Sequence, residues 1–361
     1  MKFYLPTTVY EETECVINHG TEITALGSHP LIVTGRHSAK ACGALSDVCR
    51  VLEAAGQKYT IFDQVEENPS RETVMAGREE GLKDSCDYVI AIGGGSPMDA
   101  GKGMALMMAN PAWGIEELYE KHENDRALPV VAIPTTCGTG SEVTGVAVLT
   151  RHDKKTKGSI PSKIYPAYAL LDEKYLHSAP MQMLCDTAVD ALAHLVESYM
   201  NAKATDFSRT FAKEGLTAWS RNKEVLSGKR PLMKEDYHNL LYASTMGGMA
   251  IAHTGTALPH AMSYPATYEL SIPHGRACGY YLCGYLRVLG EEGRIMVPKM
   301  AGFSDVDEME TFLFEILHMD ESDIPYEFRK ETAMRMAVNR AKLKTSPISL
   351  EEKDLLVIAR V

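Results

Sequence analysis

The chain has 361 residues, of which 45% are hydrophobic and 24% are charged. This length exceeds what a single core usually supports, so it predicts two domains. The formal net charge of −11 argues against nucleic acid and anionic membrane surfaces as partners, because both attract basic proteins.

Nothing in the sequence indicates export or membrane insertion. No apolar run reaches the roughly 18 residues of a membrane-spanning helix, and the N-terminus MKFYLPTTVYEETE lacks a signal-peptide core. The eight cysteines form no CxxC pair. We therefore expect reduced, mostly buried thiols, a cytoplasmic location and no structural zinc site built from cysteines.

Strand and helix patterns alternate in the first half of the chain. Apolar runs predict strands at 29–35, 58–65 and 128–136, and DYVIAIGGG adds another before a helix. Asn68 is predicted to cap the helix that runs through GREEGLKD. This alternation predicts a doubly wound, mainly parallel sheet.

The pattern becomes helical from about Ser178. Apolar residues recur every three or four positions in MQMLCDTAVDALAHLVESYM, and two further segments, RTFAKEGLTAWSRN and DYHNLLYASTMGGMAIAH, also favour helices. Ser349 and Glu352 form a capping-box pattern for a C-terminal helix. The expected organisation is a nucleotide-binding α/β domain at 1–178 and an all-α metal-binding and substrate domain at 179–361.

The stretch IGGGSPMDAGKG (92–103) follows a predicted strand and opens a predicted helix. Its three glycines permit a tight turn, Ser96 is a candidate N-cap, and Asp99 completes a capping-box pattern. Backbone N–H groups at such a helix start predict a pyrophosphate site. The alternative is a tight turn without a ligand.

A hydroxyl-rich loop, IPTTCGTGSEVT (133–144), follows the strand predicted at 128–136. Ligands of open α/β sheets bind at the carboxyl ends of parallel strands, so this loop is a candidate second wall of the same crevice. The alternative is a polar surface loop.

Two pairs of side chains suggest a metal site. Asp190 and His194 lie four residues apart in VDALAHLVES, which places them on one helix face. His260 and His274 occur in LPHAMSYPATYELSIPHG, a segment whose prolines and glycine favour turns. Each pair alone is compatible with a core role, but one carboxylate and three imidazoles suit Fe²⁺ or Zn²⁺.

These motifs, in this order, resemble the iron-containing (group III) alcohol dehydrogenases. VEENPS (65–70) and ALLDEKY (169–175) are similar to the family as well. The resemblance implies a dehydroquinate synthase-like architecture, and it implies that Asp190, His194, His260 and His274 are the metal ligands. His253 lies outside that register. The residues assigned to the cofactor are Gly35, Arg36, His37, Ser38, Asn68, Gly93, Gly94, Gly95, Ser96, Asp99, Thr135, Thr136, Thr139, Thr144 and Lys157.

The sequence departs from the family pattern at two positions. Family members that use NAD commonly carry an aspartate after the first strand, whereas VTGRHSAK places Gly35 there, followed by Arg36 and Lys40. Positive donors without a carboxylate predict a preference for NADP, with NAD as the alternative. Many relatives also carry a histidine at the position of Tyr264. Tyr264 is the candidate catalytic residue, either as a hydrogen-bond donor near the nicotinamide or as part of the pocket wall.

The expected function is metal-dependent interconversion of primary alcohols and aldehydes by hydride transfer with NADP, using Fe²⁺ or alternatively Zn²⁺. A homodimer is the default expectation. A lyase of the dehydroquinate-synthase type is the first alternative, but the ligand motifs lack the basic cluster that a phosphorylated substrate requires. A non-catalytic protein is the second, and the complete ligand set argues against it.

Overall fold

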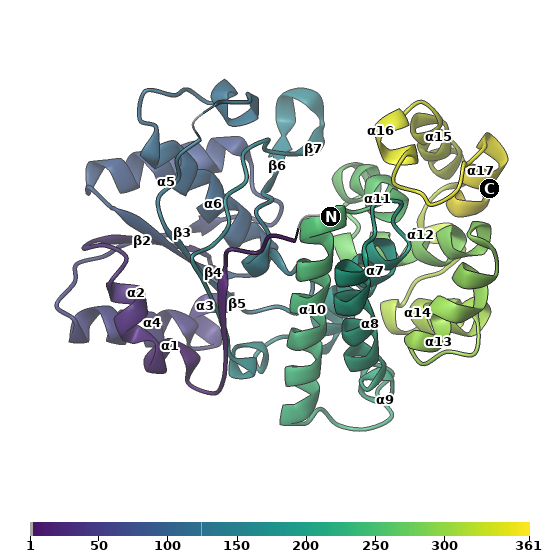
Figure 1. The fold of residues 1–361 in the computed structure, drawn as a ribbon, viewed down its shortest axis with the longest axis horizontal. Helices are drawn as coiled ribbons and strands as arrows, with labels where there is room; N and C mark the ends of the chain where they lie inside the picture. The colour runs from purple at the N-terminus through teal and green to yellow at the C-terminus, as the bar shows by residue number, and fades with distance from the viewer. Residues whose placement is uncertain (1–2, 124) are drawn as a thin grey trace. The chain divides into compact units, whose positions relative to one another are not determined.

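The computed structural model describes residues 3–123 and 125–361. They form two compact units (Figure 1). The α/β unit comprises Leu5–Thr136 and Gly140–Ala179, and the helical unit comprises Phe3, Tyr4, Cys137–Thr139 and Pro180–Val361.

The α/β unit is built on a six-stranded sheet with the order β1-β8-β5-β4-β2-β3, in which all neighbouring strands are parallel. This confirms the predicted doubly wound fold. The sheet strands are β1 Thr8–Glu11, β2 Pro30–Gly35, β3 Thr60–Val65, β4 Tyr88–Gly93, β5 Val130–Pro134 and β8 Tyr168–Leu171, and β6 Val148–Arg151 pairs with β7 Thr156–Ser159 in an antiparallel hairpin. Sequence reasoning missed β1, β6, β7 and β8, because four residues are too few to establish a period.

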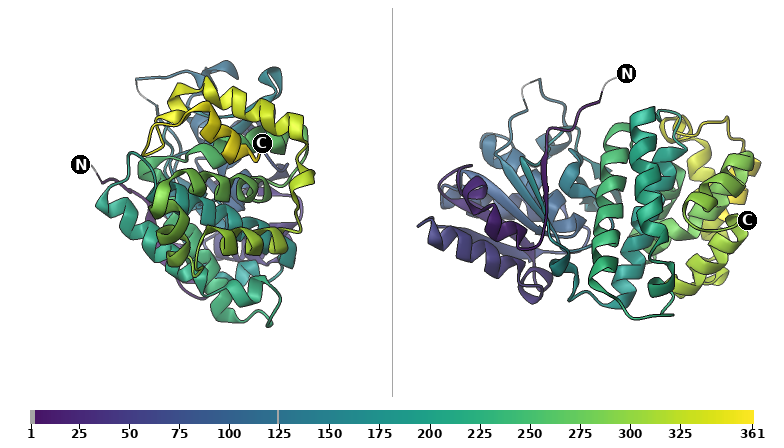
Figure 2. Two further views of the ribbon diagram at one scale, coloured as in Figure 1. Left: turned by 90° about the vertical axis from the view of Figure 1, so that its right-hand side faces the viewer. Right: turned by 60° about the horizontal axis from the view of Figure 1, so that its bottom comes forward.

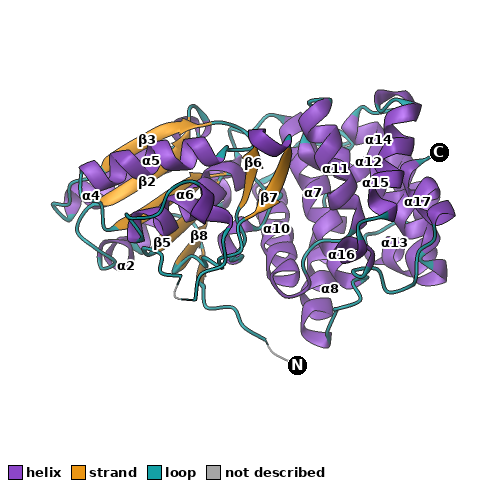
Figure 3. Cartoon of the chain, turned by 90° about the horizontal axis from the view of Figure 1, so that it is seen from above, coloured by secondary structure: helices purple, strands orange, loops and turns teal. Residues whose placement is uncertain are grey.

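Helices cover both faces of the sheet because successive strand residues point to opposite sides. Leu31 and Val33 share a core with Val74 and Met104 of α5 and α6. Ile32 packs in the opposite core, to which α1, α2, α3 and α4 contribute (Figure 3). The helices are α1 Cys15–Asn18, α2 Gly20–Thr24, α3 Ser38–Ala41, α4 Ala44–Ala54, α5 Arg71–Lys83 and α6 Gly95–Ala109.

The strand order reverses between β2 and β4, which makes their carboxyl ends the topological switch point of the sheet. Gly35 ends β2, and Gly93 ends β4. Ligands of open α/β sheets bind at such a point, and both predicted cofactor segments follow strands that end there.

Two predicted helix starts are wrong. Helix α6 begins at Gly95 with Gly94 as its N-cap, and none of the described side chains caps it. Ser96 therefore lies inside the helix rather than at its cap. Helix α5 is capped by Ser70, whose hydroxyl accepts from the Thr73 N–H, whereas Asn68 lies before it with a φ of 57°.

The helical unit is centred on the largely buried α7, and Figure 2 shows its helices packed side by side in the green to yellow part of the chain. No helix in the described part of the chain is both long and apolar enough to span a membrane. The helices are α7 Met181–Tyr199, α8 Asp206–Ser220, α9 Lys223–Leu226, α10 Lys234–Thr254, α11 Leu258–Glu269, α12 His274–Val288, α13 Val297–Met300, α14 Val306–Leu317, α15 Tyr326–Ala337, α16 Arg340–Leu343 and α17 Glu352–Ala359.

The turn-rich interpretation of residues 258–275 is wrong, because this segment forms α11 and the start of α12. Pro259 lies in the first turn of α11, where a missing N–H costs nothing. The turn is confined to a few residues around Ser271, whose φ is 57°. The capping box of α17 is also different from the prediction, since Glu351 and Asp354 form it.

Candidate functional site

The structure brings most of the predicted metal ligands together within the helical unit. Ligand atoms of Asp190, His260, His274 and Cys278 all lie within 4.8 Å of one another. Asp190 Oδ1 is 3.3 Å from His260 Nε2 and 3.8 Å from His274 Nε2. Bonds of 2.0–2.1 Å to a tetrahedral cation would separate two such ligand atoms by about 3.3–3.4 Å. The spacing therefore suits a bound divalent ion.

His194 lies one helical turn after Asp190, beside this cluster. Its ring stacks on that of His260 with centroids 4.3 Å apart. Its Nδ1 is 3.1 Å from the carbonyl oxygen of Gly138. A hydrogen bond donated by Nδ1 leaves the lone pair of Nε2 available to a metal.

Gly275 explains how α12 can present His274 to α7. A Cβ atom at Gly275 would lie 1.9 Å from the carbonyl oxygen of Asp186, so only glycine permits this approach. The guanidinium of Arg276 donates to both carboxylate oxygens of Asp186, at 3.2 and 3.1 Å. The start of α12 is therefore fixed on α7 one turn before Asp190.

Two atoms of the cluster are buried without a hydrogen-bond partner in the described chain, namely Asp190 Oδ1 and His260 Nε2. They face each other without hydrogen-bond geometry, in residues that are 3% and 2% exposed. Each unsatisfied buried polar group costs roughly 1–3 kcal/mol. A cation between them would remove this cost, so the residues fit a metal.

The electrostatics of the cluster also favour a positive charge. Burial alone would raise the pKa of Asp190, but the imidazoles of His194, His260 and His274 outweigh it and hold this pKa below its ordinary value. Burial lowers the pKa of His194 and thereby favours the neutral ring that metals bind. Burial likewise opposes charge on His260, yet Cys278, Glu197 and Asp190 together raise its pKa.

Sequence reasoning missed Glu197, which supports the cluster from α7. The Glu197 carboxylate is fully buried, and its Oε1 lies 2.5 Å from His260 Nδ1. Ser263 Oγ takes a similar place 3.3 Å from His274 Nδ1. Such partners fix the ring orientation of metal-binding histidines. Helical spacing could have identified Glu197, since it lies seven residues after Asp190 on the same face.

Tyr264 lies next to the cluster on α11. Its ring stacks near that of His274, with centroids 5.6 Å apart and an interplanar angle of 23°. The side chain of His274 is 24% exposed to solvent, whereas those of Asp190 and His260 are almost fully buried. The cluster is therefore accessible from the side of His274.

The glycine loop and its neighbouring threonines meet in the α/β unit. Gly93 has a φ of 150°, and a Cβ atom there would lie 2.5 Å from Pro97 Cγ. A Cβ atom at Gly94 would lie 2.9 Å from Thr136 Oγ1, and the Thr135 N–H donates to the Gly93 carbonyl. Gly94, the N-cap of α6, has no side chain that could accept from the first turn, and free N–H groups at a helix start are suited to an anion.

Hydrogen bonds join three other predicted cofactor residues, Asn68, Ser96 and Lys157, next to the glycine loop. The Asn68 N–H donates to Ser96 Oγ at 3.0 Å. The ammonium of Lys157 donates to Asn68 Oδ1. Thr139 does not belong to this unit, because Cys137–Thr139 groups with the helical unit.

Asp99 and Thr144 contact the interior of the α/β unit. Asp99 accepts from Ser141 Oγ at 2.6 Å and from the Val148 N–H at 2.9 Å. Thr144 Oγ1 lies 3.4 Å from the ammonium of Lys102, a fully buried residue that sequence reasoning missed. Burial lowers the pKa of Lys102 to about 8. These contacts connect α6 to the segment that follows β5. They thereby hold α6, whose start forms the glycine loop, in place within the unit.

The segment after β2 carries the predicted specificity residues. Gly35 ends the strand, and Arg36 and His37 lead into α3, which begins at Ser38. Lys40 donates to Asp63 Oδ2 at 2.6 Å. The carboxylate of Asp63 therefore partly neutralises the ammonium of Lys40, which weakens the attraction of this segment for a 2′-phosphate.

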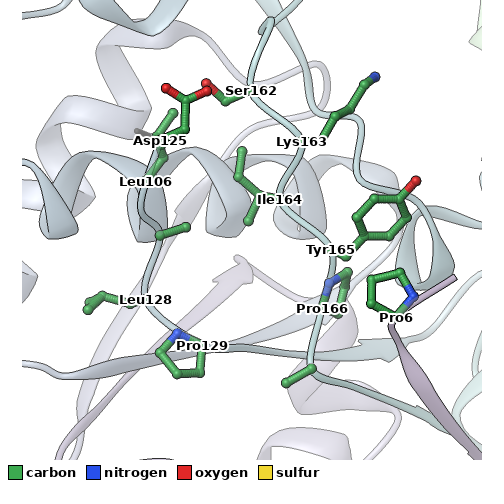
Figure 4. Close-up of a pocket in the computed structure, with 12 residues that line it drawn as sticks. Pro6, Leu106, Asp125, Leu128, Pro129, Ser162, Lys163, Ile164, Tyr165 and Pro166 are labelled. Atoms are coloured by element: carbon green, nitrogen blue, oxygen red, sulfur yellow. The ribbon is translucent and has the colours of Figure 1, made fainter. Parts of the chain in front are cut away.

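A cavity of about 340 Å³ opens elsewhere in the α/β unit. Figure 4 shows Lys163, Ile164 and Tyr165 on one side of it and Leu128 and Pro129 on another. It contains none of the predicted site residues, so neither the glycine loop nor the metal cluster lines it.

Fold and site together define a two-unit protein with a dinucleotide-type sheet and a helical metal cluster. The chain belongs to the iron-containing alcohol dehydrogenase family, since the family's sequence models match residues 6–173 ("Iron-containing alcohol dehydrogenase") and 184–309 ("Fe-containing alcohol dehydrogenase family, C-terminal"). It is therefore an oxidoreductase of the alcohol dehydrogenase type.

Individual relatives agree with this assignment. The long-chain primary alcohol dehydrogenase AdhA of Thermoanaerobacter ethanolicus is 31% identical over 79% of this chain and 75% of its own length. The probable alcohol dehydrogenase EutG of Salmonella typhimurium is 32% identical over 72% of this chain, and the match spans only 65% of EutG. The crystal structure of an iron-containing alcohol dehydrogenase from Thermotoga maritima superposes with a TM-score of 0.90, at 34% identity, covering 99% of this chain and 98% of the other.

Proposed function

We propose that the chain interconverts primary alcohols and aldehydes by hydride transfer, with a divalent metal held by Asp190, His194, His260 and His274. The observation that carries this proposal is the buried cluster in which Asp190 Oδ1 and His260 Nε2 lie 3.3 Å apart and have no hydrogen-bond partner in the described structure. Iron is the metal that the family name implies, and zinc suits the same ligands.

The chain's own residues position the reactants. When bound, the metal supplies Lewis acidity toward a substrate oxygen and the nicotinamide supplies or accepts the hydride. Glu197 and Ser263 hold the rings of His260 and His274 with their Nε2 atoms toward Asp190. Burial of Asp190 and His260 keeps bulk water away, and the exposed edge of His274 leaves a route for a small substrate.

We expect a Glu197→Gln substitution to weaken metal binding roughly 10–100-fold, because a missing outer partner of a metal-binding histidine has this effect. Glutamine keeps the shape of the side chain but loses the charge that faces His260 Nδ1. Titration of the apoprotein against a competing chelator measures the change. Glu214→Gln, at an exposed position on α8, is the matched control, and equal affinities in the two variants would refute the role of Glu197.

Tyr264 is the proposed proton donor to the substrate oxygen during aldehyde reduction. Burial raises the pKa of its phenol to about 12, so the hydroxyl stays protonated at neutral pH and can donate a hydrogen bond. We expect Tyr264→Phe to lower kcat for aldehyde reduction by about 10²-fold, which is the lower end for general-acid catalysis. Metal content and the KM for the cofactor should not change.

The control is Tyr280→Phe, because the Tyr280 hydroxyl donates to the Glu321 carbonyl instead of facing the cluster. If Tyr264→Phe retained the kcat of the Tyr280→Phe chain, Tyr264 would only line the pocket.

NADP is the proposed preferred cofactor because Gly35 stands where a carboxylate would disfavour the 2′-phosphate. A relative that is 30% identical over 260 residues, from Clostridium saccharobutylicum, is an NADPH-dependent butanol dehydrogenase. A sulfoacetaldehyde reductase structure at 25% identity contains NAD⁺, so relatives of both kinds occur. The proposed assembly is a homodimer, and the free cysteines, six of them buried, fit a reducing compartment such as the cytoplasm.

Initial rates test this function directly. Protein loaded with Fe²⁺ without air, and in parallel with Zn²⁺, is assayed for NADPH and NADH oxidation with butyraldehyde and a panel of small aldehydes. We expect chelator-sensitive turnover that favours NADPH. Turnover that favours NADH would refute the cofactor preference alone. Absence of turnover at full metal occupancy would refute the proposed reaction and favour a lyase.

A further inference from the structure

We infer that Cys278 is an additional ligand of the metal, which its sulfur binds as a thiolate after the thiol proton is released to solvent. The inference rests on the proposed function, since both require a metal in this cluster. It adds a donor that the resemblance to the family did not supply, and it changes the chemical character of the site from nitrogen and oxygen alone to one that includes sulfur.

The backbone places Cys278 correctly for this role. Cys278 follows His274 by four residues on α12, the same spacing that puts Asp190 and His194 on one face of α7. Cys278 is fully buried. Its sulfur therefore points from α12 into the cluster rather than toward solvent.

The distances fit a shared cation. Cys278 Sγ lies 3.8 Å from His274 Nε2, and it is within 4.8 Å of the ligand atoms of Asp190 and His260. With Cys278 the metal would have five ligands, and bonds of 2.3 Å to sulfur and 2.0–2.1 Å to nitrogen at angles of 90–120° would separate the two atoms by about 3.1–3.8 Å. The observed separation of Cys278 Sγ and His274 Nε2 therefore allows both atoms to bind the same metal ion.

A second observation points to the same centre. Asp190 Oδ1 and His260 Nε2 are buried without hydrogen-bond partners in the described chain, and they belong to the group of ligand atoms that includes Sγ. Two other cysteines of the helical unit lie outside this group, since Cys137 contacts the Thr187 hydroxyl and Cys185 donates to the Leu226 carbonyl. Cys278 instead faces the imidazole of His274.

The consequence concerns the choice of metal. Soft thiolate ligands favour zinc over harder ions, whereas imidazole and carboxylate accept both iron and zinc. A sulfur ligand therefore shifts this site toward zinc relative to the same site without it. Replacing Cys278 should reduce the preference for Zn²⁺ over Fe²⁺ when the two compete for the apoprotein.

Zinc K-edge X-ray absorption on the zinc-loaded full chain tests the inference. We expect one sulfur scatterer at about 2.3 Å beside nitrogen and oxygen at 2.0–2.1 Å. Cys278→Ser should lose the sulfur shell while retaining zinc. Cys283→Ser is the matched control, because Cys283 is a buried thiol on another face of the same helix. The zinc bound to the Cys283→Ser chain should keep its sulfur neighbour.

Each outcome decides a separate question when zinc content is measured independently by mass spectrometry. Bound zinc with only nitrogen and oxygen neighbours would overturn the role of Cys278 and leave the proposed function intact. A wild-type chain that binds neither zinc nor iron would overturn both. A sulfur shell that persists in Cys278→Ser would also overturn the assignment. Cys278→Ala serves as the second variant if the serine chain does not fold.

Discussion

An Asp190→Asn chain is expected to lose metal and to reduce aldehydes with a kcat/KM lower by roughly 10²–10⁴-fold. Asparagine keeps the shape of the side chain but removes the only carboxylate among the four proposed ligands. Lewis-acid assistance contributes several kcal/mol to the transition state, and each 1.36 kcal/mol corresponds to a factor of about ten in rate. The buried cluster then has three imidazoles with no carboxylate to hold the cation among them.

Metal content by mass spectrometry and initial rates at saturating NADPH measure this effect together. Asp206→Asn makes the same change of charge at an exposed position on α8 and should change neither quantity. Circular dichroism establishes that both variants are folded. An Asp190→Asn chain with a full complement of metal and normal turnover would contradict the proposed ligand set.

Gly35→Asp is expected to shift the cofactor preference from NADPH toward NADH by roughly 10–100-fold in kcat/KM. An aspartate here would accept hydrogen bonds from the ribose hydroxyls of NADH and repel the 2′-phosphate of NADPH. A hydrogen bond to a charged group contributes about 1.5–3 kcal/mol. The backbone tolerates the change, because a Cβ atom at Gly35 would lie 3.4 Å from the Val65 carbonyl oxygen, an ordinary contact.

Gly35→Ala is the control, since it adds the Cβ atom without the charge. The ratio of kcat/KM for the two cofactors should change in Gly35→Asp and remain close to wild type in Gly35→Ala. A wild-type chain that already prefers NADH, with no change on adding the aspartate, would show that Gly35 does not set the preference. Asp63 would then be the first residue to examine, because it already pairs with Lys40.

The sequence predicted the elements whose signals are local. Strands such as β2 and β4 are apolar runs that end in glycine, and the periodicity of α7 identified Asp190 and His194 as neighbours on one face. The glycine loop was also recognisable, because three consecutive glycines follow a predicted strand. In the structure, a side chain at Gly93 or Gly94 would collide with Pro97 or Thr136.

What the sequence did not predict depends on packing between elements. Residues 258–275 were expected to form turns because of their prolines, whereas packing in the helical unit stabilises helices that include Pro265. The proximity of Cys278 to Asp190 requires α12 to press against α7 at Gly275. The contact of Glu197 with His260 likewise needs α7 and α11 to meet. No pattern within one segment encodes these pairings.

Titration of the metal-free chain with Fe²⁺ or Zn²⁺, while NADPH-dependent aldehyde reduction is followed without air, tests the central claim most directly. The proposed function predicts that activity rises linearly with added metal, reaches a plateau at one equivalent and disappears when a chelator removes the ion. Full activity in the metal-free chain, or an occupied site with no activity toward any aldehyde, would contradict it.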